Sequence, residues 1–213
     1  MNSLLSFSST TPVLSQLEQE HLLEKLEVFK VQGRDKCGRQ VVRVIGKIFP
    51  ARLVSREVLK KYLEDKIFPQ LKESPFSVVY VHTGVQRCKN FPGISALRSI
   101  YDAIPMNIRD RLEAVYFLHP SLQVRLFLAT FGRLLFSGRL YEKVKYVNRL
   151  EFLWEHVKRK EIVIPEFVND HDGELEYRPM MMTYYGLESD HPRIFCAPSM
   201  DSSVSMFSMR CIA

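Results

Sequence analysis

Hydrophobic positions in this chain form short blocks whose spacing alternates between that of strands and that of helices. Four segments rich in β-branched or aromatic residues are predicted as strands: 40–45, 77–81, 113–118 and 144–147. Helical spacing or capping residues mark the segments that alternate with them: 55 to about 68, 93–104, 107–111, 122–136 and 149–160. Strands separated by helices predict an α/β fold, with a mostly parallel sheet flanked by helices and right-handed crossovers.

The predicted helix at 122–136 is apolar nearly all round. At about 100° per residue, one arc is uniformly apolar and consists of Val124, Phe127, Leu128, Phe131, Leu134 and Leu135. The opposite arc mixes Arg125 and Arg133 with Leu122, Leu126 and Phe136. Apolar residues beside arginines suit a lipid surface or a movable lid over an apolar cavity. A helix that is apolar all round is also typical of an ordinary protein core, so the local pattern leaves both interpretations open.

Composition and cysteine spacing indicate a globular protein without a membrane-spanning segment. With 213 residues, 46% of them hydrophobic and 25% charged, we expect one globular domain with tails. No apolar run approaches the roughly 18 residues needed to cross a membrane. Residues 1–16 are rich in Ser and Thr and carry no charge, which predicts a flexible leader. The cysteines lack metal or redox spacing, so we expect reduced thiols in a cytoplasmic protein.

Charge is unevenly distributed along the chain. Residues 120–160 contain 9 Lys/Arg and 3 Asp/Glu, a net charge of +6, whereas residues 161–213 contain 3 and 9, a net charge of −6. A basic body with an acidic tail indicates anionic partners such as phospholipid headgroups or acidic protein surfaces. The basic residues are dispersed and no nucleic-acid-binding motif accompanies them, so we expect no nucleic-acid partner.

Motifs for catalysis, cofactors or metals are not evident. The sequence has no nucleophile elbow, P-loop or dinucleotide fingerprint, and we expect no cofactor and no enzymatic activity. His82 and His119 follow predicted strands, where α/β folds place ligands, and Ser121 is close to the second. A hydrogen-bonding or capping role is the simpler interpretation of both histidines. We expect 170–172 (Asp-His-Asp) to be solvated rather than to bind a metal.

The order of these segments resembles the CRAL-TRIO lipid-binding domain over about residues 25–168. The resemblance is carried, in order, by GRDKCGRQVVRVIG, SVVYVHTGV, FPGISALRSIYDAIP, RLEAVYFLHPS, LFLATFGRLLFSGRLYEKVKYV, LEFLWEHV and IPEFV. Val81-His82-Thr83-Gly84 followed by Phe117-Leu118-His119-Pro120-Ser121 is similar to the divergent branch of that family. That branch includes BCH domains, a Rho GTPase-activating protein and ganglioside-induced differentiation-associated protein 2, and short plant phosphatidylinositol-transfer-like proteins are similar too.

The resemblance implies an apolar pocket floored by the sheet and closed by a mobile gate helix, here 122–136. The expected pocket residues are Val115, Phe117, Val124, Phe127, Leu128, Phe131, Leu134 and Leu135. A Glu and a Lys contact the headgroup in phosphatidylinositol-transfer members. They align with Asp110 and Lys143, and Arg125 is a further headgroup candidate from its position on the helix. Leu122, Leu126, Arg133 and Phe136 are expected to form the membrane face.

These observations predict three parts: a flexible leader at 1–22, a lipid-binding domain at 23–168 and an acidic, largely flexible tail at 169–213. We expect non-enzymatic binding of a phospholipid or other apolar molecule by a protein peripheral to an anionic membrane surface. A protein-interaction module that engages small GTPases or their regulators, as BCH domains do, is the alternative, and a hydrolase is a weaker one.

Overall fold

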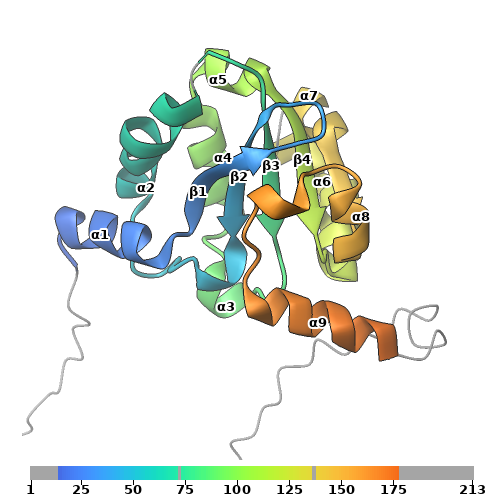
Figure 1. Cartoon of the computed structure of the whole chain (residues 1–213). Coiled ribbons are helices and arrows are strands. Elements are labelled where there is room, and N and C mark those ends of the chain that lie inside the picture. Colours follow the sequence, from blue (N-terminus) through green and yellow to red (C-terminus); the bar gives the residue numbers. More distant parts are fainter. Residues whose placement is uncertain (1–13, 72, 136–137, 178–213) are drawn as a thin grey trace, which may run out of the picture. The chain divides into compact units, whose positions relative to one another are not determined.

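A five-stranded sheet forms the centre of the domain (Figure 1). The computed structural model describes residues 14–71, 73–135 and 138–177. Strands lie side by side in chain order, and β1 is antiparallel to β2 whereas the other neighbours are parallel. The strands are β1 (Phe29–Arg34), β2 (Gln40–Ile45), β3 (Phe76–Val81), β4 (Leu112–Leu118) and β5 (Val144–Val147). The predicted fold class, α/β with a mostly parallel sheet flanked by helices, is confirmed.

Helices cover both faces of this sheet (Figure 1). They are α1 (Gln16–Leu26), α2 (Arg56–Tyr62), α3 (Arg87–Asn90), α4 (Ile94–Ala103), α5 (Met106–Arg111), α6 (Leu122–Leu135), α7 (Gly138–Lys143), α8 (Leu150–Trp154) and α9 (Glu166–Tyr177). After α2 the chain continues as a π-helical turn, Leu63–Ile67, and a 3-10 turn, Phe68–Leu71. Because the parallel strands follow one another in space as they do in sequence, right-handed crossovers place α2, α4, α5 and α6 on one face.

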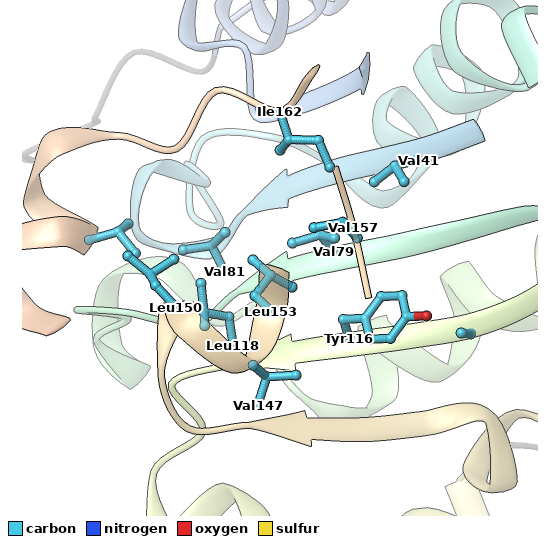
Figure 2. Packing of buried hydrophobic residues seen from close by; sticks show 12 residues of the cluster. Val41, Val79, Val81, Tyr116, Leu118, Val147, Leu150, Leu153, Val157 and Ile162 are labelled. Carbon is cyan, nitrogen blue, oxygen red and sulfur yellow. The ribbon is translucent and has the colours of Figure 1, made fainter. Parts of the chain in front are cut away.

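The face opposite the crossover helices is a closed apolar core (Figure 2). Alternate side chains of β2 to β5 point to this face and are buried under α8, the segment after it and α9. The cluster comprises Val41, Val79, Val81, Ala114, Tyr116, Leu118, Val147, Leu150, Leu153, Val157, Ile162 and Val168. We call it the α8 core. Burial of large aliphatic side chains stabilises the fold by about 1.5–3 kcal/mol each, before the cost of ordering the chain.

The crossover side carries a second core, but only over part of the sheet. Side chains of α1, α2 and α5 pack with Val42 and Phe76, and the α4 residues Ile100 and Ile104 pack against the same cluster. No described residue of α6 belongs to either core cluster. On this side, the part of the sheet formed by β3, β4 and β5 is therefore not covered by a core cluster that includes described residues of α6.

A buried carboxylate closes the turn between β1 and β2. The Asp35 side chain is fully buried and accepts hydrogen bonds from Ser77 Oγ at 2.9 Å, the Arg39 amide at 2.9 Å and Arg39 Nε at 2.6 Å. Burial alone would raise the pKa of Asp35, but these bonds outweigh it and hold that pKa below its ordinary value. The GRDKCGR segment is thus fixed to Ser77 of β3.

Domain boundaries differ from those predicted at both ends. Helix α1 begins inside the predicted leader, where Ser15 and Glu18 form a capping box. Helix α9 crosses the predicted boundary at 168, so residues 169–177 are helical rather than part of a flexible tail. Residues 1–13 and 178–213, to which the rest of the leader and tail predictions refer, lie outside the described residues. The helix predicted at 149–160 is shorter, because α8 ends at Trp154 and only a 3-10 turn follows, Arg159–Glu161.

Candidate functional site: the space between α6 and the sheet

Helix α6 starts from a fixed turn at the carboxyl end of β4. Pro120 is buried, and Ser121 caps the helix, because its Oγ accepts from the Val124 amide at 3.4 Å and its carbonyl oxygen from the Arg125 amide at 3.1 Å. Proline and serine at this point explain why the strand ends and the helix begins within a few residues.

The described side chains of α6, residues 122–132, are apolar but incompletely buried. Val124, Phe127 and Leu128 are half-buried, and Leu122, Leu126 and Phe131 are 44%, 58% and 51% exposed. Among these residues only Gly132 is buried, where a Cβ would lie 2.8 Å from the Tyr141 ring. Val124, Phe127 and Leu128 of the predicted inward arc are thus less exposed than Leu122 and Leu126, but Phe131 of the same arc contacts Phe127, at 5.5 Å between ring centroids, rather than being enclosed. The side chains of Arg133, Leu134, Leu135 and Phe136 lie outside the described residues.

The sheet surface on this side carries a row of aromatic rings. Phe117 lies at its centre, with ring centroids 4.8 Å from Tyr80, 5.2 Å from His82 and 6.2 Å from Tyr146. We call these four residues the aromatic floor. Its outer ring, Tyr146, is 38% exposed, and the other three are half-buried, as is Val115 beside them. Burial raises the pKa of Tyr80 to about 12, so its hydroxyl stays protonated at neutral pH.

The two sides of β4 differ in how completely they are covered. Ala114, Tyr116 and Leu118 belong to the buried α8 core, whereas Val115 and Phe117, which point the other way, stay half-buried. Arg125 of α6 lies with its guanidinium carbon 5.7 Å from the centroid of the Tyr146 ring, so α6 begins over the outer end of the aromatic floor. The strands therefore have one sealed face and one face whose apolar side chains retain exposure beneath or beside α6.

The candidate headgroup residues lie at opposite ends of the parallel strands. Lys143 Nζ donates to the carbonyl oxygen of Leu112, the first residue of β4, and Asp110 is exposed in α5 just before it. Arg125 instead donates to Asn148, which follows the last residue of β5. Seven residues of β4 separate these edges, which at ~3.3 Å per residue is about 20 Å. One headgroup cannot contact both sets, so Arg125 forms a separate candidate from Asp110 and Lys143.

A buried histidine organises the carboxyl edge of the sheet. His119 Nδ1 lies 2.7 Å from Thr83 Oγ1, and its Nε2 lies 3.0 Å from Asp172 Oδ1. The same Asp172 oxygen accepts from the Leu150 amide at 2.8 Å and Arg149 Nε at 3.2 Å. The hydrogen-bonding role predicted for His119 is confirmed. The expectation that Asp172 is solvated is wrong, because it lies on α9 and accepts hydrogen bonds from His119, Arg149 and the Leu150 amide.

Burial decides the protonation of this cluster. Burial lowers the pKa of His119, and its bond to Asp172 only partly offsets this, so the ring is neutral at pH 7. Partial burial opposes ionisation of Asp172, but the hydrogen bonds from Leu150, His119 and Arg149 outweigh it and lower its pKa. The consistent arrangement is a neutral imidazole that accepts from Thr83 and donates to the Asp172 carboxylate.

Thr83, His119 and Asp172 are hydrogen-bonded in the order of a hydroxyl nucleophile, a base and a carboxylate that orients the base. Their burial nevertheless disfavours catalysis. Thr83 is 4% exposed and His119 is 8% exposed, so neither can meet a substrate in this conformation. Among the described residues, no group of three His, Cys, Asp or Glu side chains is arranged to hold a metal ion. No helix in the described ranges is both long and apolar enough to span a bilayer.

Three residues of the aromatic floor were not predicted as pocket residues: Tyr80, His82 and Tyr146. A signal was present, because alternate positions of a strand share a face, and Tyr80 and His82 are in phase with each other along the extended chain that includes β3. The pairing of Tyr80 with Phe117, and of Phe117 with Tyr146, depends on the strand register, which the sequence alone did not provide.

Comparison with known proteins identifies the class. Residues 38–174 match the divergent CRAL/TRIO domain, and the chain belongs to that family, whose domains are in general ligand-binding. Among its relatives is human Rho GTPase-activating protein 1, which is 30% identical over 151 residues, 70% of this chain and 34% of the relative. Ganglioside-induced differentiation-associated protein 2 from Xenopus tropicalis is 30% identical over 162 residues, 75% of this chain and 32% of the relative. The chain thus spans about a third of the length of these relatives.

Proposed function

We propose that this domain binds a phospholipid or another apolar molecule, without catalysis, between α6 and the aromatic floor. One observation carries the proposal: the apolar side chains of α6 described here are not buried, and neither are the sheet residues Val115 and Phe117. Apolar groups that oppose one another without closing a core are typical of a ligand site. Membership of a family of ligand-binding domains supports the same interpretation.

Burial of hydrocarbon would supply most of the affinity. Each methylene transferred from water to an apolar environment contributes about 0.8 kcal/mol, so ten methylenes supply roughly 8 kcal/mol before the cost of ordering the chain and ligand. The guanidinium of Arg125, at the carboxyl edge, is placed to orient a phosphate or carbonyl group. Lys143 and Asp110 would contact only a ligand that enters from the opposite edge.

The outer side of α6 supports action at a membrane surface. Leu122 and Leu126 are exposed one helical turn apart, and Arg125 lies between them in sequence. Exposed apolar residues beside arginine suit the headgroup region of an anionic bilayer, where each cation is worth about 1 kcal/mol. We therefore propose α6 as the gate helix of a cytoplasmic protein that is peripheral at membranes.

A space-filling variant tests this function. Val115 is half-buried beside Phe117, so Val115→Trp should occupy the space below α6 and reduce uptake of phosphatidylcholine with a fluorescent acyl chain by at least tenfold. Val163→Trp is the matched control, because Val163 is 62% exposed and distant from the floor in sequence. Equal uptake by the parent protein and a folded Val115→Trp variant would contradict the proposed site.

A protein-interaction module is the second candidate, favoured by the similarity to a Rho GTPase-activating protein. In that case Leu122, Leu126 and Phe131 would contact a small GTPase or one of its regulators rather than lipid. Leu126→Glu should then abolish binding of a Rho-family GTPase measured by calorimetry, whereas Val115→Trp should leave it unchanged. Lipid uptake lost only in Val115→Trp, with no GTPase binding by the parent protein, would favour the lipid function.

A further inference from the structure

Helix α9 is joined to the turn before α6 by the Asp172 carboxylate, and the His171 ring lies against His119 with its centroid 5.0 Å away. Asp172 accepts from His119 in the turn before α6, and from Arg149 and the Leu150 amide at the start of α8. Its side chain is only 15% exposed. Three chain segments that are distant in sequence therefore meet at one residue of α9, at the carboxyl edge of the sheet.

The turn that leads into α6 depends on His119. Its backbone has a φ of +51°, a left-handed conformation that residues other than glycine rarely adopt. Its amide donates to the Val147 carbonyl oxygen at 2.9 Å, and both ring nitrogens are engaged, by Thr83 and Asp172. Only Pro120 and Ser121 separate His119 from the first residue of α6. The surrounding contacts hold this strained backbone in place, so loosening them would release the start of the helix.

Beyond its first turn, α6 makes fewer buried contacts than the turn at His119 does. Its described residues lie outside both core clusters, and its apolar side chains are half-buried or exposed. An element with few buried contacts opens at low free energy, and the fixed turn at its start then controls how it opens. The hydrogen bonds at His119 fix the turn from which this weakly held helix starts.

We infer that α9 is a latch on α6: docking of Asp172 against His119 holds the start of α6, and release of this contact, with Val168 still buried in the α8 core, allows α6 to move and the ligand to exchange. This inference rests on the proposed function, in which α6 covers the ligand. It predicts that contacts made with α9 change the rates of ligand entry and exit more than the equilibrium affinity.

Two aspartates of α9 provide a matched pair for the test. Asp172→Ala removes the latch, whereas Asp170→Ala alters an exposed carboxylate two positions earlier in the same helix. Uptake and release of phosphatidylcholine with a fluorescent acyl chain are followed by stopped flow, and amide hydrogen exchange is measured for residues 119–132. We expect Asp172→Ala to accelerate both uptake and release at least fivefold, to change the dissociation constant less than threefold, and to raise hydrogen exchange in α6. Asp170→Ala should behave like the parent protein.

The outcomes separate the latch from a purely structural role. Increased hydrogen exchange confined to α8 and α9, with unchanged lipid kinetics, would overturn the latch. If Asp172→Ala does not fold, Thr83→Val preserves shape, removes the hydroxyl that binds His119, and should produce the same changes to a smaller extent. If the parent protein takes up no lipid, the proposed function fails, but the exchange measurement still decides whether Asp172 restrains α6.

Discussion

Phe117 and Leu118 are neighbours on β4 that point to opposite faces of the sheet, so their substitution by alanine should have different consequences. Leu118 is fully buried in the α8 core, whereas Phe117 is half-buried at the centre of the aromatic floor. We therefore expect Leu118→Ala to reduce mainly stability and Phe117→Ala to reduce mainly ligand binding.

The expected magnitudes follow from burial. Removing a fully buried leucine side chain costs about 2–5 kcal/mol, because apolar burial is lost and a cavity remains. Phe117 is partly exposed already, so its loss should cost about 1–2 kcal/mol, mostly from ring contacts with Tyr80, His82 and Tyr146. A fully enclosed phenylalanine would instead cost about 3–5 kcal/mol. For a domain of this size, each kcal/mol corresponds to a change in Tm of roughly 2–4 °C.

Two measurements on the same protein samples give the comparison. Urea unfolding gives the free energy of unfolding of each variant, and titration with an acyl-labelled fluorescent phosphatidylcholine gives the dissociation constant. We expect Phe117→Ala to weaken binding at least tenfold while remaining more stable than Leu118→Ala. A Phe117→Ala variant that is as unstable as Leu118→Ala, yet binds lipid like the parent protein when folded, would refute the assignment of an open face.

Further consequences concern charge and hydrogen bonding. Arg125→Glu should weaken binding to vesicles that contain phosphatidylserine by roughly tenfold, since one favourable charge becomes unfavourable; equal binding of the parent protein to neutral vesicles would contradict this. Because burial lowers the pKa of His119, the unfolded chain protonates first as pH falls. Stability should therefore decline below about pH 6.5 and less so in His119→Gln, as urea midpoints at pH 7.5 and 5.5 would show. Asp172, His171 and Arg149 also face this ring and set the depth of the decline. Asp35→Ala should lower the free energy of unfolding by about 3 kcal/mol, since Arg39 and Ser77 lose a buried acceptor; a loss below about 1 kcal/mol in thermal denaturation would contradict this role.

The parallel strands could be predicted from their apolar, β-branched and aromatic residues, most of which are buried in β2 and β3, whereas β5 is buried only at Val147. β2 and β5 have the predicted bounds, and β3 and β4 differ from their predictions by one residue. Continuous apolar, β-branched runs arise where both faces of a strand are covered. The edge strand β1, Phe29–Arg34, was not predicted, because its residues FKVQGR are mixed in polarity and only one neighbour, β2, pairs with it.

Helix α9 could not be found from periodicity. Its sequence contains many charged residues, and its contribution to the α8 core is confined to Val168, which is buried, and Phe167, which packs against the cluster. Its position is also fixed by the bonds from Asp172 to His119 and to the start of α8, across 53 and 22 or 23 residues of sequence. Local patterns do not contain such long-range polar contacts, so a charged segment with two apolar anchors is easily taken for a solvated tail.

For the candidate site, the sequence predicted the elements better than their arrangement. The position of Val115 and Phe117 on one side of β4 follows from strand periodicity. The exposure of Phe131, and the separation of Arg125 from Lys143 and Asp110, depend on tertiary packing and on the end of the strands that each residue reaches. Spacing along the chain does not determine either quantity.

Native mass spectrometry of the purified chain tests most sharply whether an apolar molecule binds between α6 and the aromatic floor. We expect the 24.9 kDa protein to carry a discrete adduct that organic extraction identifies as a lipid, and a folded Val115→Trp variant to lack it. Bare protein after incubation with phospholipid vesicles, or the same adduct on both proteins, would contradict the claim.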